Sequence, residues 1–305
     1  MAKGFEYSDE KGKGRSFVKQ KFLVIGGDLR QLACAKSLIK KGYEVTVYGF
    51  FDIYLKGLSK SENLTEDMMR SDYVLLPLPV TKDGKTVNTP LWDDIIQLSQ
   101  IKETLRDKTV VFGGMIKDSD LLQRDLVFDY AKEEEFLIKN AQITAEGALD
   151  IIFSETPHSL YGSNILIAGY GRIGKILSRL CKALGANVSV SARNERDLSW
   201  IALSGCRPLR YDYLNKDLSE FDIIINTVPM QIFKKEQIQN INPECLFVDL
   251  ASVPGGIDWD AAKEAGLKTI WALSLPGKVA PYSSGNIIAD TLINLLETKK
   301  LSHKE

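Results

Sequence analysis

Histidine is almost absent from this chain, because only His158 and His303 occur among its 305 residues. Two isolated imidazoles cannot build a histidine metal cluster, and a Ser-His-Asp triad would have to use His158. His158 follows Thr156 and Pro157 just before an apolar segment, so we expect a turn residue there and not a catalytic one. Acid–base chemistry must then come from lysine, tyrosine, carboxylates or water.

Cysteine is scarce as well, and neither sign of charge is in excess. The four cysteines are widely scattered and form no CxxC pair, so we expect neither a metal site nor a disulfide framework. Three of them have apolar or helical surroundings and are expected to act as small buried hydrophobes. Lys and Arg number 39 against 40 Asp and Glu, so no cationic field favours a nucleic-acid partner.

Long apolar runs are missing too. No stretch approaches the ~18 consecutive apolar residues that indicate a membrane-spanning helix, and the N-terminus shows no apolar segment of the secretory type. We therefore expect a reduced, cytoplasmic protein without membrane contact. The composition, 44% hydrophobic and 26% charged, is that of a globular protein, and the length fits two domains.

The chain contains two blocks in which apolar strands alternate with amphipathic helices. In the first block the strands are expected at 22–25, 44–48, 72–77 and 109–112, with 135–138 as a candidate fifth and a helix at 29–41. In the second block the strands are expected at 164–168, 187–192, 222–226, 245–250 and 268–273, with a helix at 172–184. Such β-α repeats predict an α/β fold, with two doubly wound Rossmann-like domains and a cleft between them.

The predicted domain boundaries follow from these blocks. They are a polar tail (1–20), a first Rossmann-like domain on the substrate side (21–140), an interdomain helix (141–158), a cofactor-binding Rossmann domain (159–284) and a C-terminal helix that packs back towards the junction (285–305). The tail is rich in Gly and Lys and lacks periodicity, so no role is assigned to it.

The most informative motif is GYGRIG at residues 169–174, a GxGxxG that follows an apolar strand and opens an amphipathic helix. In this context the pattern predicts dinucleotide binding. The first glycine permits the tight turn, the second lets a pyrophosphate approach the backbone, and the third lets the helix pack closely on the strand. Free N–H groups at the helix start then bind the phosphates. The predicted contacts are Gly169, Gly171, Arg172, Ile173 and Gly174.

The end of the next strand bears on the choice between NAD and NADP. An NAD site usually has a carboxylate there for the ribose 2′-OH, but this sequence has Ser191, Arg193 and Asn194. A guanidinium pairs well with a 2′-phosphate. We therefore predict NADP as the cofactor, with NAD beside a solvated arginine as the alternative. Further backbone contacts are predicted where the third apolar strand of this block ends, at Thr227, Val228 and Pro229.

The first block has a related turn, GGDLRQ at residues 26–31, which lacks the second and third glycines of the fingerprint. Asp28 would repel a pyrophosphate, so we expect one dinucleotide site and not two. Helix N-terminal amides beside a cation suit a carboxylate better. Arg30 is therefore predicted to bind substrate, with an ordinary salt bridge as the alternative.

Two Pro- and Gly-rich loops follow the last two predicted strands, at 249–256 and 274–285. Ligands of open α/β sheets collect at the carboxyl ends of strands, so both loops are expected beside the ligand, although turn chemistry alone is the alternative. The predicted substrate contacts in the first loop are Ser252, Gly255 and Gly256. In the second loop, Lys278 and Tyr282 supply polar side chains.

Several segments together resemble a known family. GGDLRQ, LPLPV, ITAEG, GYGRIGK with GANVSVSAR, INTVP, DLASVPGGID and LPGKVAPYSSG are similar to the A-type dipicolinate synthase subunit of spore-forming bacteria, from about Lys21 to Lys299. The resemblance implies an NADP-dependent enzyme of the sporulating mother cell that converts 4-hydroxytetrahydrodipicolinate, a dicarboxylate, to dipicolinate. It also implies a flavoprotein-like partner, which is the B-type dipicolinate synthase subunit. In addition, we expect the chain to form a homo-oligomer.

The implied reaction needs cations for a dianionic substrate and a group that moves protons. Arg30 and Lys278 are the predicted cations, and proton transfer is left open between Lys278, Tyr282 and Glu146. Two other functions stay open. One is another two-lobed NAD(P)-dependent dehydrogenase, of the alanine dehydrogenase or methylene-tetrahydrofolate dehydrogenase type. The other is a non-catalytic NADP-binding subunit.

Overall fold

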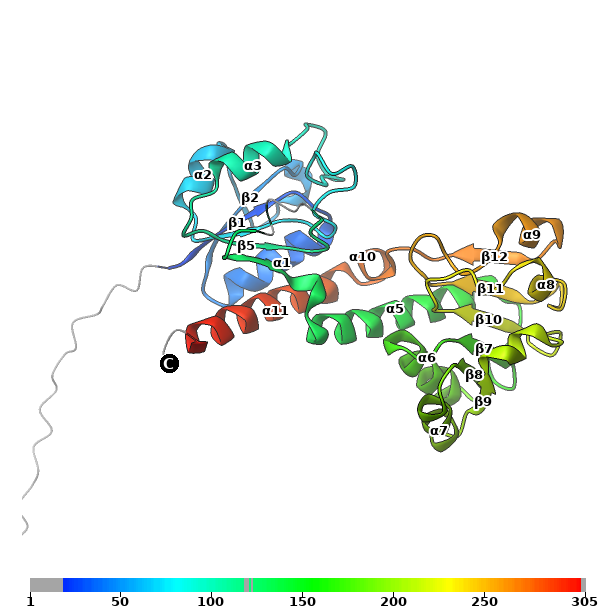
Figure 1. Cartoon of the computed structure of the whole chain (residues 1–305). Coiled ribbons are helices and arrows are strands. Elements are labelled where there is room, and N and C mark those ends of the chain that lie inside the picture. Colours follow the sequence, from blue (N-terminus) through cyan, green and yellow to red (C-terminus); the bar gives the residue numbers. More distant parts are fainter. Residues whose placement is uncertain (1–18, 118–120, 122, 303–305) are drawn as a thin grey trace, which may run out of the picture.

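In the part of the chain that the structure describes, two six-stranded parallel sheets form two lobes (Figure 1). The structure is a computed structural model and describes residues 19–117, 121 and 123–302. The predicted tail at 1–20 therefore lies outside the described residues, apart from Lys19 and Gln20. The predicted α/β class with two doubly wound sheets is confirmed.

The first sheet has the strand order β3-β2-β1-β4-β5-β6. Its central strand, KFLVI, is apolar at four of five positions because helices cover both faces of a parallel sheet. The strands are β1 (Lys21–Ile25), β2 (Glu44–Tyr48), β3 (Ser59–Lys60), β4 (Tyr73–Leu75), β5 (Val110–Gly113) and β6 (Val127–Asp129). The helices of this lobe are α1 (Leu29–Lys40), α2 (Leu64–Arg70) and α3 (Leu98–Thr104).

The second sheet has the same topology, since its order β9-β8-β7-β10-β11-β12 repeats the order of the first sheet strand for strand. This is the order of dinucleotide-binding Rossmann folds. The strands are β7 (Asn164–Ala168), β8 (Asn187–Ala192), β9 (Arg207–Arg210), β10 (Ile223–Asn226), β11 (Leu246–Asp249) and β12 (Lys268–Trp271). The helices are α6 (Arg172–Ala183), α7 (Glu195–Leu203), α8 (Lys235–Ile238) and α9 (Trp259–Glu264).

Two segments connect the lobes, as Figure 1 shows. The long helix α5 (Glu134–Glu155) leads from the first sheet to the second, and α10 (Leu275–Val279) with α11 (Pro281–Ser302) leads back. Helix α11 packs on α1 of the first lobe. A Cβ on Gly285 would lie only 2.7 Å from the backbone nitrogen of Cys34, so glycine permits this close helix contact. The C-terminal helix thereby completes the core of the first lobe.

The candidate strand at 135–138 is wrong, because these residues form the first turns of α5. Short apolar runs do not distinguish a strand from a helix. The acidic Glu134 and Glu135 instead suit the positive end of a helix macrodipole. The last strand of the first sheet is β6, which has only three residues. The loop expected at 274–285 also contains α10 and the start of α11.

The cysteines all lie in the interior of the protein. All four cysteines are buried and free, one more than the three expected. Burial raises the pKa of the Cys181 and Cys245 thiols to about 12, so both behave as apolar groups. Among the described residues, no helix is long and apolar enough to cross a membrane.

Candidate active site

The turn between β7 and α6 is open at its second glycine. Gly169 has a φ of +99°, a left-handed conformation that favours glycine, and its N–H donates to Ser191 O at 3.1 Å. A Cβ on Gly174 would run into the carbonyl oxygen of Gly169, which explains the close helix–strand packing. Around Gly171 a Cβ would meet no heavy atom within 4 Å. Gly169 thus adopts the tight turn, Gly174 allows the helix to pack closely on the strand, and Gly171 leaves space for a ligand.

The first amides of α6 are free of side-chain capping. Gly171 is the N-cap of α6, and no side chain of a described residue accepts from the helix N-terminus there. Uncapped N–H groups at a helix start bind anions such as phosphate. These residues therefore fit the pyrophosphate of a dinucleotide.

The equivalent turn of the first lobe is filled by the chain itself. The carboxylate of Asp28 accepts from Arg30 N at 2.9 Å, and the Gln31 side chain accepts from Asp28 N at 3.1 Å. Gly27 N donates to Asn88 O at 2.9 Å. These three amides are occupied within the chain, which does not support the expectation that they receive a substrate carboxylate. An acidic N-cap fills that place.

Beside Gly171 lies a cavity of about 310 Å³ at the ends of β7, β8 and β10, which we call the strand-end cavity. It brings together most of the predicted cofactor residues, from both the glycine turn and the two later strands. Its lining is Gly169, Tyr170, Gly171, Ser191, Ala192, Arg193, Asn194, Asp197, Tyr211, Thr227, Val228 and Pro229.

Within the strand-end cavity, Arg193 and Asn194 differ in their availability. The Arg193 guanidinium lies 5.7 Å from the ring centroid of Tyr211, a cation–π distance, and forms no ion pair among the described residues. Asn194 is the N-cap of α7 and accepts from Asp197 N at 2.8 Å. Its amide group also donates to the Asp197 carboxylate. Arg193 is therefore available to a ligand, whereas Asn194 is committed to the helix.

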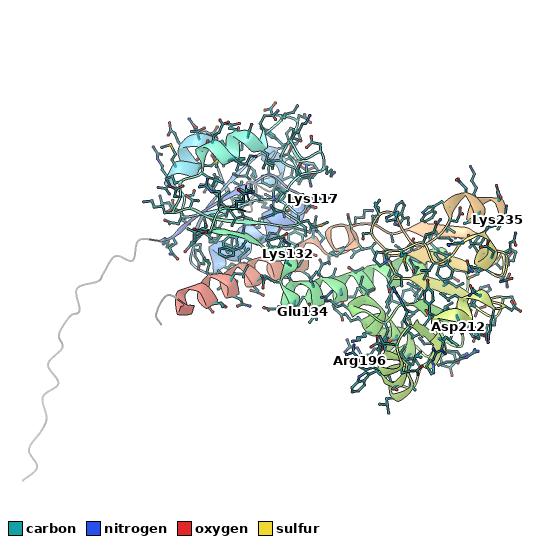
Figure 2. The ribbon with its side chains drawn as sticks, in the orientation of Figure 1. Lys117, Lys132, Glu134, Arg196, Asp212 and Lys235 are labelled. Atoms are coloured by element: carbon teal, nitrogen blue, oxygen red, sulfur yellow. The ribbon has the colours of Figure 1, made fainter. Side chains whose placement is uncertain are left out.

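A second cavity of about 270 Å³, the bridging cavity, continues from the first. It shares Gly171 and Thr227 with the strand-end cavity, and it adds the predicted contacts Arg172 and Ile173. Arg172 is ion-paired with Glu134 at the start of α5, with Nε donating to Oε1 at 3.0 Å. This pairing lowers the pKa of the Glu134 carboxyl. Figure 2 shows Glu134 at the end of α5 nearer the first lobe.

Between the lobes lies a larger cavity of about 580 Å³, the interlobe cleft. Its first wall comes from the first lobe, its floor from α5, and its second wall from the loops after β11 and β12. The lining is Arg30, Leu78, Pro79, Met115, Ala131, Phe136, Leu137, Asn140, Thr144, Ile173, Leu250, Ser252, Ala272, Leu273, Ser274, Leu275 and Pro276. Most of these side chains are apolar, and Arg30 is the charged one among them.

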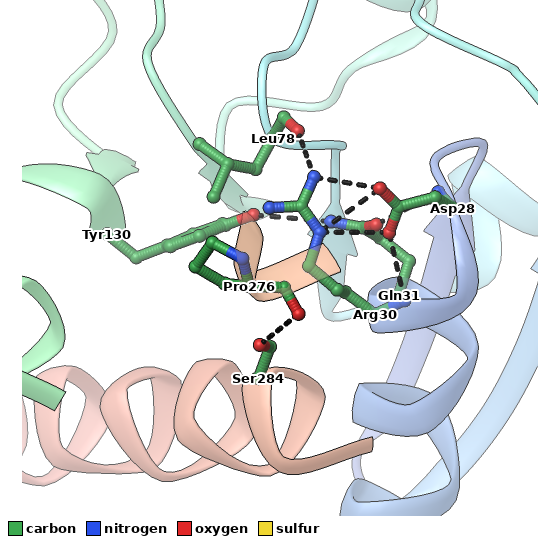
Figure 3. Close-up of polar contacts among 7 residues, drawn as sticks. All are labelled: Asp28, Arg30, Gln31, Leu78, Tyr130, Pro276 and Ser284. Carbon is green, nitrogen blue, oxygen red and sulfur yellow. Dashed lines mark hydrogen bonds and ion pairs between the residues drawn. The ribbon is translucent and has the colours of Figure 1, made fainter. Parts of the chain in front are cut away.

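Arg30 is buried and only partly used by the protein. It is 8% exposed, and its Nε and Nη2 donate to Asp28 while Nη2 also donates to Leu78 O at 2.8 Å (Figure 3). Among the described residues no hydrogen bond uses Nη1. A Cβ on Gly277 would lie 3.0 Å from Nε, so the segment between β12 and α11 packs directly on this guanidinium.

Near Arg30 the phenol of Tyr130 is completely buried, and it accepts from Gln31 Nε2 at 3.4 Å. Burial raises the pKa of Tyr130, so this hydroxyl stays neutral.

The loop after β11 is fixed by a buried carboxylate that the sequence analysis did not single out. Asp249 and Asn226 are both fully buried, and Asn226 Nδ2 donates to Asp249 Oδ1 at 2.8 Å. Asp249 also accepts from Gly256 N at 2.6 Å, and Gly255 N donates to Ser252 O at 2.9 Å. Both predicted glycine amides are thus engaged inside the loop and are not free donors. Ser252 is exposed and lines the interlobe cleft, and its contact with substrate stays a prediction.

The structure does not bring the predicted catalytic side chains together. Lys278 is exposed on α10, Tyr282 is 65% exposed at the start of α11, and neither lines a cavity described above. Glu146 is exposed on α5 and accepts from Gln142 Nε2 at 2.8 Å. Asn140 and Thr144 also line the cleft, although no motif in the sequence singles them out as site residues.

One open glycine fingerprint on the second of two Rossmann lobes, with a cleft beside it, defines a dinucleotide-binding oxidoreductase of the two-lobed dehydrogenase class. The comparisons agree with this class. Residues 140–253 match the NAD-binding domain of D-isomer specific 2-hydroxyacid dehydrogenases, and residues 21–122 match the N-terminal domain of A-type dipicolinate synthase subunits.

Whole-chain similarity is more specific. The A-type dipicolinate synthase subunit from Bacillus subtilis (strain 168) is 31% identical over 286 residues, which cover 90% of this chain and 95% of that protein. The crystal structure of the A-type dipicolinate synthase subunit from Bacillus halodurans superposes with a TM-score of 0.82 at 31% identity, over 91% of this chain and 97% of that chain. The chain therefore belongs to the family of A-type dipicolinate synthase subunits. A transhydrogenase from Sinorhizobium meliloti, with 17% identity and a TM-score of 0.64 over 91% of this chain and 94% of its own, shares the fold.

Proposed function

We propose that this protein is an NADP-dependent oxidoreductase that converts 4-hydroxytetrahydrodipicolinate to dipicolinate in the mother cell of a sporulating bacterium. The B-type dipicolinate synthase subunit is its proposed partner. The observation that carries the proposal is the continuity of the cavities. The strand-end cavity leads through the bridging cavity into a cleft whose charged lining residue, Arg30, has an unused guanidinium nitrogen.

The proposed reaction balances without a further oxidant. Loss of the ring hydroxyl and a neighbouring ring proton as water gives a dihydropyridine dicarboxylate. Loss of a hydride and a proton then gives the aromatic pyridine dicarboxylate. The glycine turn at Gly169–Gly174 would hold NADP⁺, which would supply the hydride acceptor when bound. The gain of aromaticity favours this direction.

NADP is proposed because of Arg193. Its guanidinium lines the strand-end cavity without an ion-pair partner among the described residues, and it can pair with a 2′-phosphate in two parallel hydrogen bonds. The ring of Tyr211 lies beneath this guanidinium at a cation–π distance. The carboxylate Asp197 in the same lining is already bonded to Asn194. Arg193 is therefore the charged side chain of the strand-end cavity that is available to a ligand.

Arg30 is proposed to bind one substrate carboxylate through Nη1. Asp28 and the Leu78 carbonyl keep its plane fixed, so the free N–H groups are oriented before the ligand arrives. The cleft lining offers no acid or base, since a guanidinium stays protonated. We therefore propose that the ring proton leaves to water, and that the chain contributes binding and orientation.

The test combines the purified chain, its separately produced partner subunit, NADP⁺ and freshly generated 4-hydroxytetrahydrodipicolinate. NADPH and the ultraviolet absorption of dipicolinate should rise together, and both rises should fail with Arg30→Ala. Tight NADPH binding without any turnover would make the chain a non-catalytic NADP-binding subunit. Turnover of alanine or methylene-tetrahydrofolate in place of the ring dicarboxylate would assign it to another two-lobed dehydrogenase.

A further inference from the structure

We propose that Asn140 is a substrate-binding residue that donates a hydrogen bond to the second carboxylate of the ring dicarboxylate whose first carboxylate is bound by Arg30. The proposal rests on the substrate class proposed above. It assigns to α5, the helix between the lobes, a direct part in binding.

The position of Asn140 is the first argument. Four residues line both the bridging cavity and the interlobe cleft, namely Leu137, Asn140, Thr144 and Ile173. They mark the place where the two cavities meet. A reacting ring must lie there, because it has to reach a cofactor that enters from the side of Gly171. Asn140 and Thr144 are the polar members of this set, and they lie one helical turn apart on the same face of α5.

The hydrogen-bonding capacity of the two side chains is the second argument. The hydroxyl of Thr144, which is 8% exposed, donates to the backbone carbonyl of Asn140 at 2.9 Å. Its oxygen can then only accept, and it does not attract a carboxylate. The side-chain amide of Asn140 forms no hydrogen bond with any described residue. Of these four residues, Asn140 therefore supplies the side-chain donor that remains available.

The charge of the ligand is the third argument. A ring dicarboxylate brings two negative charges into a cleft whose lining contains a single cation, Arg30. Asp28 and the Leu78 carbonyl already accept from Nε and Nη2 of Arg30, so the remaining nitrogen, Nη1, has capacity for one carboxylate and not for both. The second carboxylate loses hydration in a mostly apolar cleft and needs a donor there. An amide N–H at the junction meets that need without adding a titratable group.

Binding of two probes tests the proposal. Pyridine-2,6-dicarboxylate carries both carboxylates, and pyridine-2-carboxylate carries one, which the charged Arg30 should take. Calorimetry with the full chain and NADPH, in buffer freed of divalent metals, should show tighter binding of the dicarboxylate. Asn140→Ala should weaken dicarboxylate binding about tenfold and leave monocarboxylate binding unchanged. NADPH affinity, titrated separately, should not move.

Asn140→Asp separates a donor from an acceptor. The carboxylate is nearly isosteric with the amide but cannot donate and repels an anion, so it should weaken dicarboxylate binding more than alanine does. Wild-type dicarboxylate affinity in Asn140→Asp would overturn the proposal, and so would a loss confined to NADPH affinity. The matched control is Gln142→Ala, an amide on the same helix that lines none of the three cavities and bonds to Glu146.

The outcomes distinguish this inference from the proposed function. If the wild-type chain binds neither probe, the proposal of a dicarboxylate substrate is wrong, and the proposed role of Asn140 is wrong as well. If the wild-type chain prefers the dicarboxylate and the Asn140 variants keep that preference, only the role of Asn140 is wrong. Folding should not interfere, because Asn140 makes no side-chain bond with a described residue and alanine favours a helix.

Discussion

The carboxylate of Asp28 holds the guanidinium of Arg30 in a fixed plane, with Nη2 donating to Oδ2 at 2.8 Å and Nε donating to Oδ1 at 2.9 Å (Figure 3). The same carboxylate caps the first turn of α1 through Arg30 N. One acidic residue thus closes the phosphate-type turn of the first lobe and orients the cation that lines the cleft. The two Rossmann lobes thereby differ in structure at equivalent positions, with a side-chain cap at the start of α1 and none from a described residue at the start of α6.

Arg30→Lys should weaken binding of pyridine-2,6-dicarboxylate by about tenfold or more, because one ammonium group cannot bond Asp28, Leu78 and a ligand in one plane. NADPH affinity should be unchanged, since Arg30 lies outside the strand-end cavity. The contrasting variant is Lys278→Ala. Its exposed side chain lines no described cavity, so binding should stay within about twofold of the wild type. Equal effects of the two variants in calorimetry would contradict the assignment of Arg30.

Gly171→Val should abolish NADPH binding and leave the melting temperature almost unchanged. The new side chain has open space in the free protein, but it occupies the place where the pyrophosphate approaches. Gly174→Val is the matched change three residues further on. There a Cβ runs into Gly169 O, so the melting temperature itself should fall. Fluorescence titration measures NADPH affinity, and thermal unfolding measures the melting temperature. Wild-type NADPH affinity in Gly171→Val would show that the glycine fingerprint does not bind the cofactor.

The sequence was sufficient to predict most of the repeated strands and the residues that line the strand-end cavity. Central strands such as β7 and β10 contain continuous apolar runs, ILIA and III, so their positions follow from the local sequence pattern. The edge strand β9, RPLR, was missed because a charged, proline-containing segment does not resemble a strand. The segment at 135–138 was assigned wrongly because a short apolar run does not distinguish a strand from the first turns of a helix.

The residues of the interlobe cleft could not be predicted equally well, because their arrangement depends on contacts that the local sequence does not show. Asp28 was expected to repel a phosphate, but it also binds Arg30, whose Nη2 donates in addition to the carbonyl of Leu78, 48 residues further along the chain. Gly255 and Gly256 were expected to donate to a ligand, but Asp249 and Ser252 accept from them. Asn140 drew no attention because a single asparagine in a helix has no motif around it. Its significance comes from the two cavities it lines.

Arg193→Asp should weaken NADPH binding by about 1.5–3 kcal/mol, roughly tenfold to a hundredfold, because it removes one charge-assisted pair and adds repulsion of the 2′-phosphate. NADH binding should change far less, since a carboxylate can accept from a 2′-OH. Arg196→Asp is the control. Arg196 is highly exposed on α7 and lines no described cavity (Figure 2). Equal losses for both cofactors in fluorescence titrations would refute the NADP assignment.

Glu134→Gln should tighten NADPH binding severalfold at low salt. In the free protein the Glu134 carboxylate occupies Arg172, which belongs to the glycine fingerprint and lines the bridging cavity. A pyrophosphate that uses this guanidinium must displace the carboxylate and then lie near its negative charge. The neutral amide removes both effects. Because the pair is exposed to solvent, the gain should shrink as salt is added.

The pH dependence of this effect follows from the direction of the pKa shift. The hydrogen bond from Arg172 lowers the pKa of Glu134, so the pair is complete above the ordinary carboxyl range and is lost only as the pH falls through the lowered value. The difference between wild type and Glu134→Gln should therefore be constant between about pH 6 and about pH 8. Glu135→Gln is the matched control, since Glu135 pairs with Lys139 and not with Arg172. If both glutamine variants tighten NADPH binding equally, general charge near the lobe junction is the cause, and the competition for Arg172 is excluded.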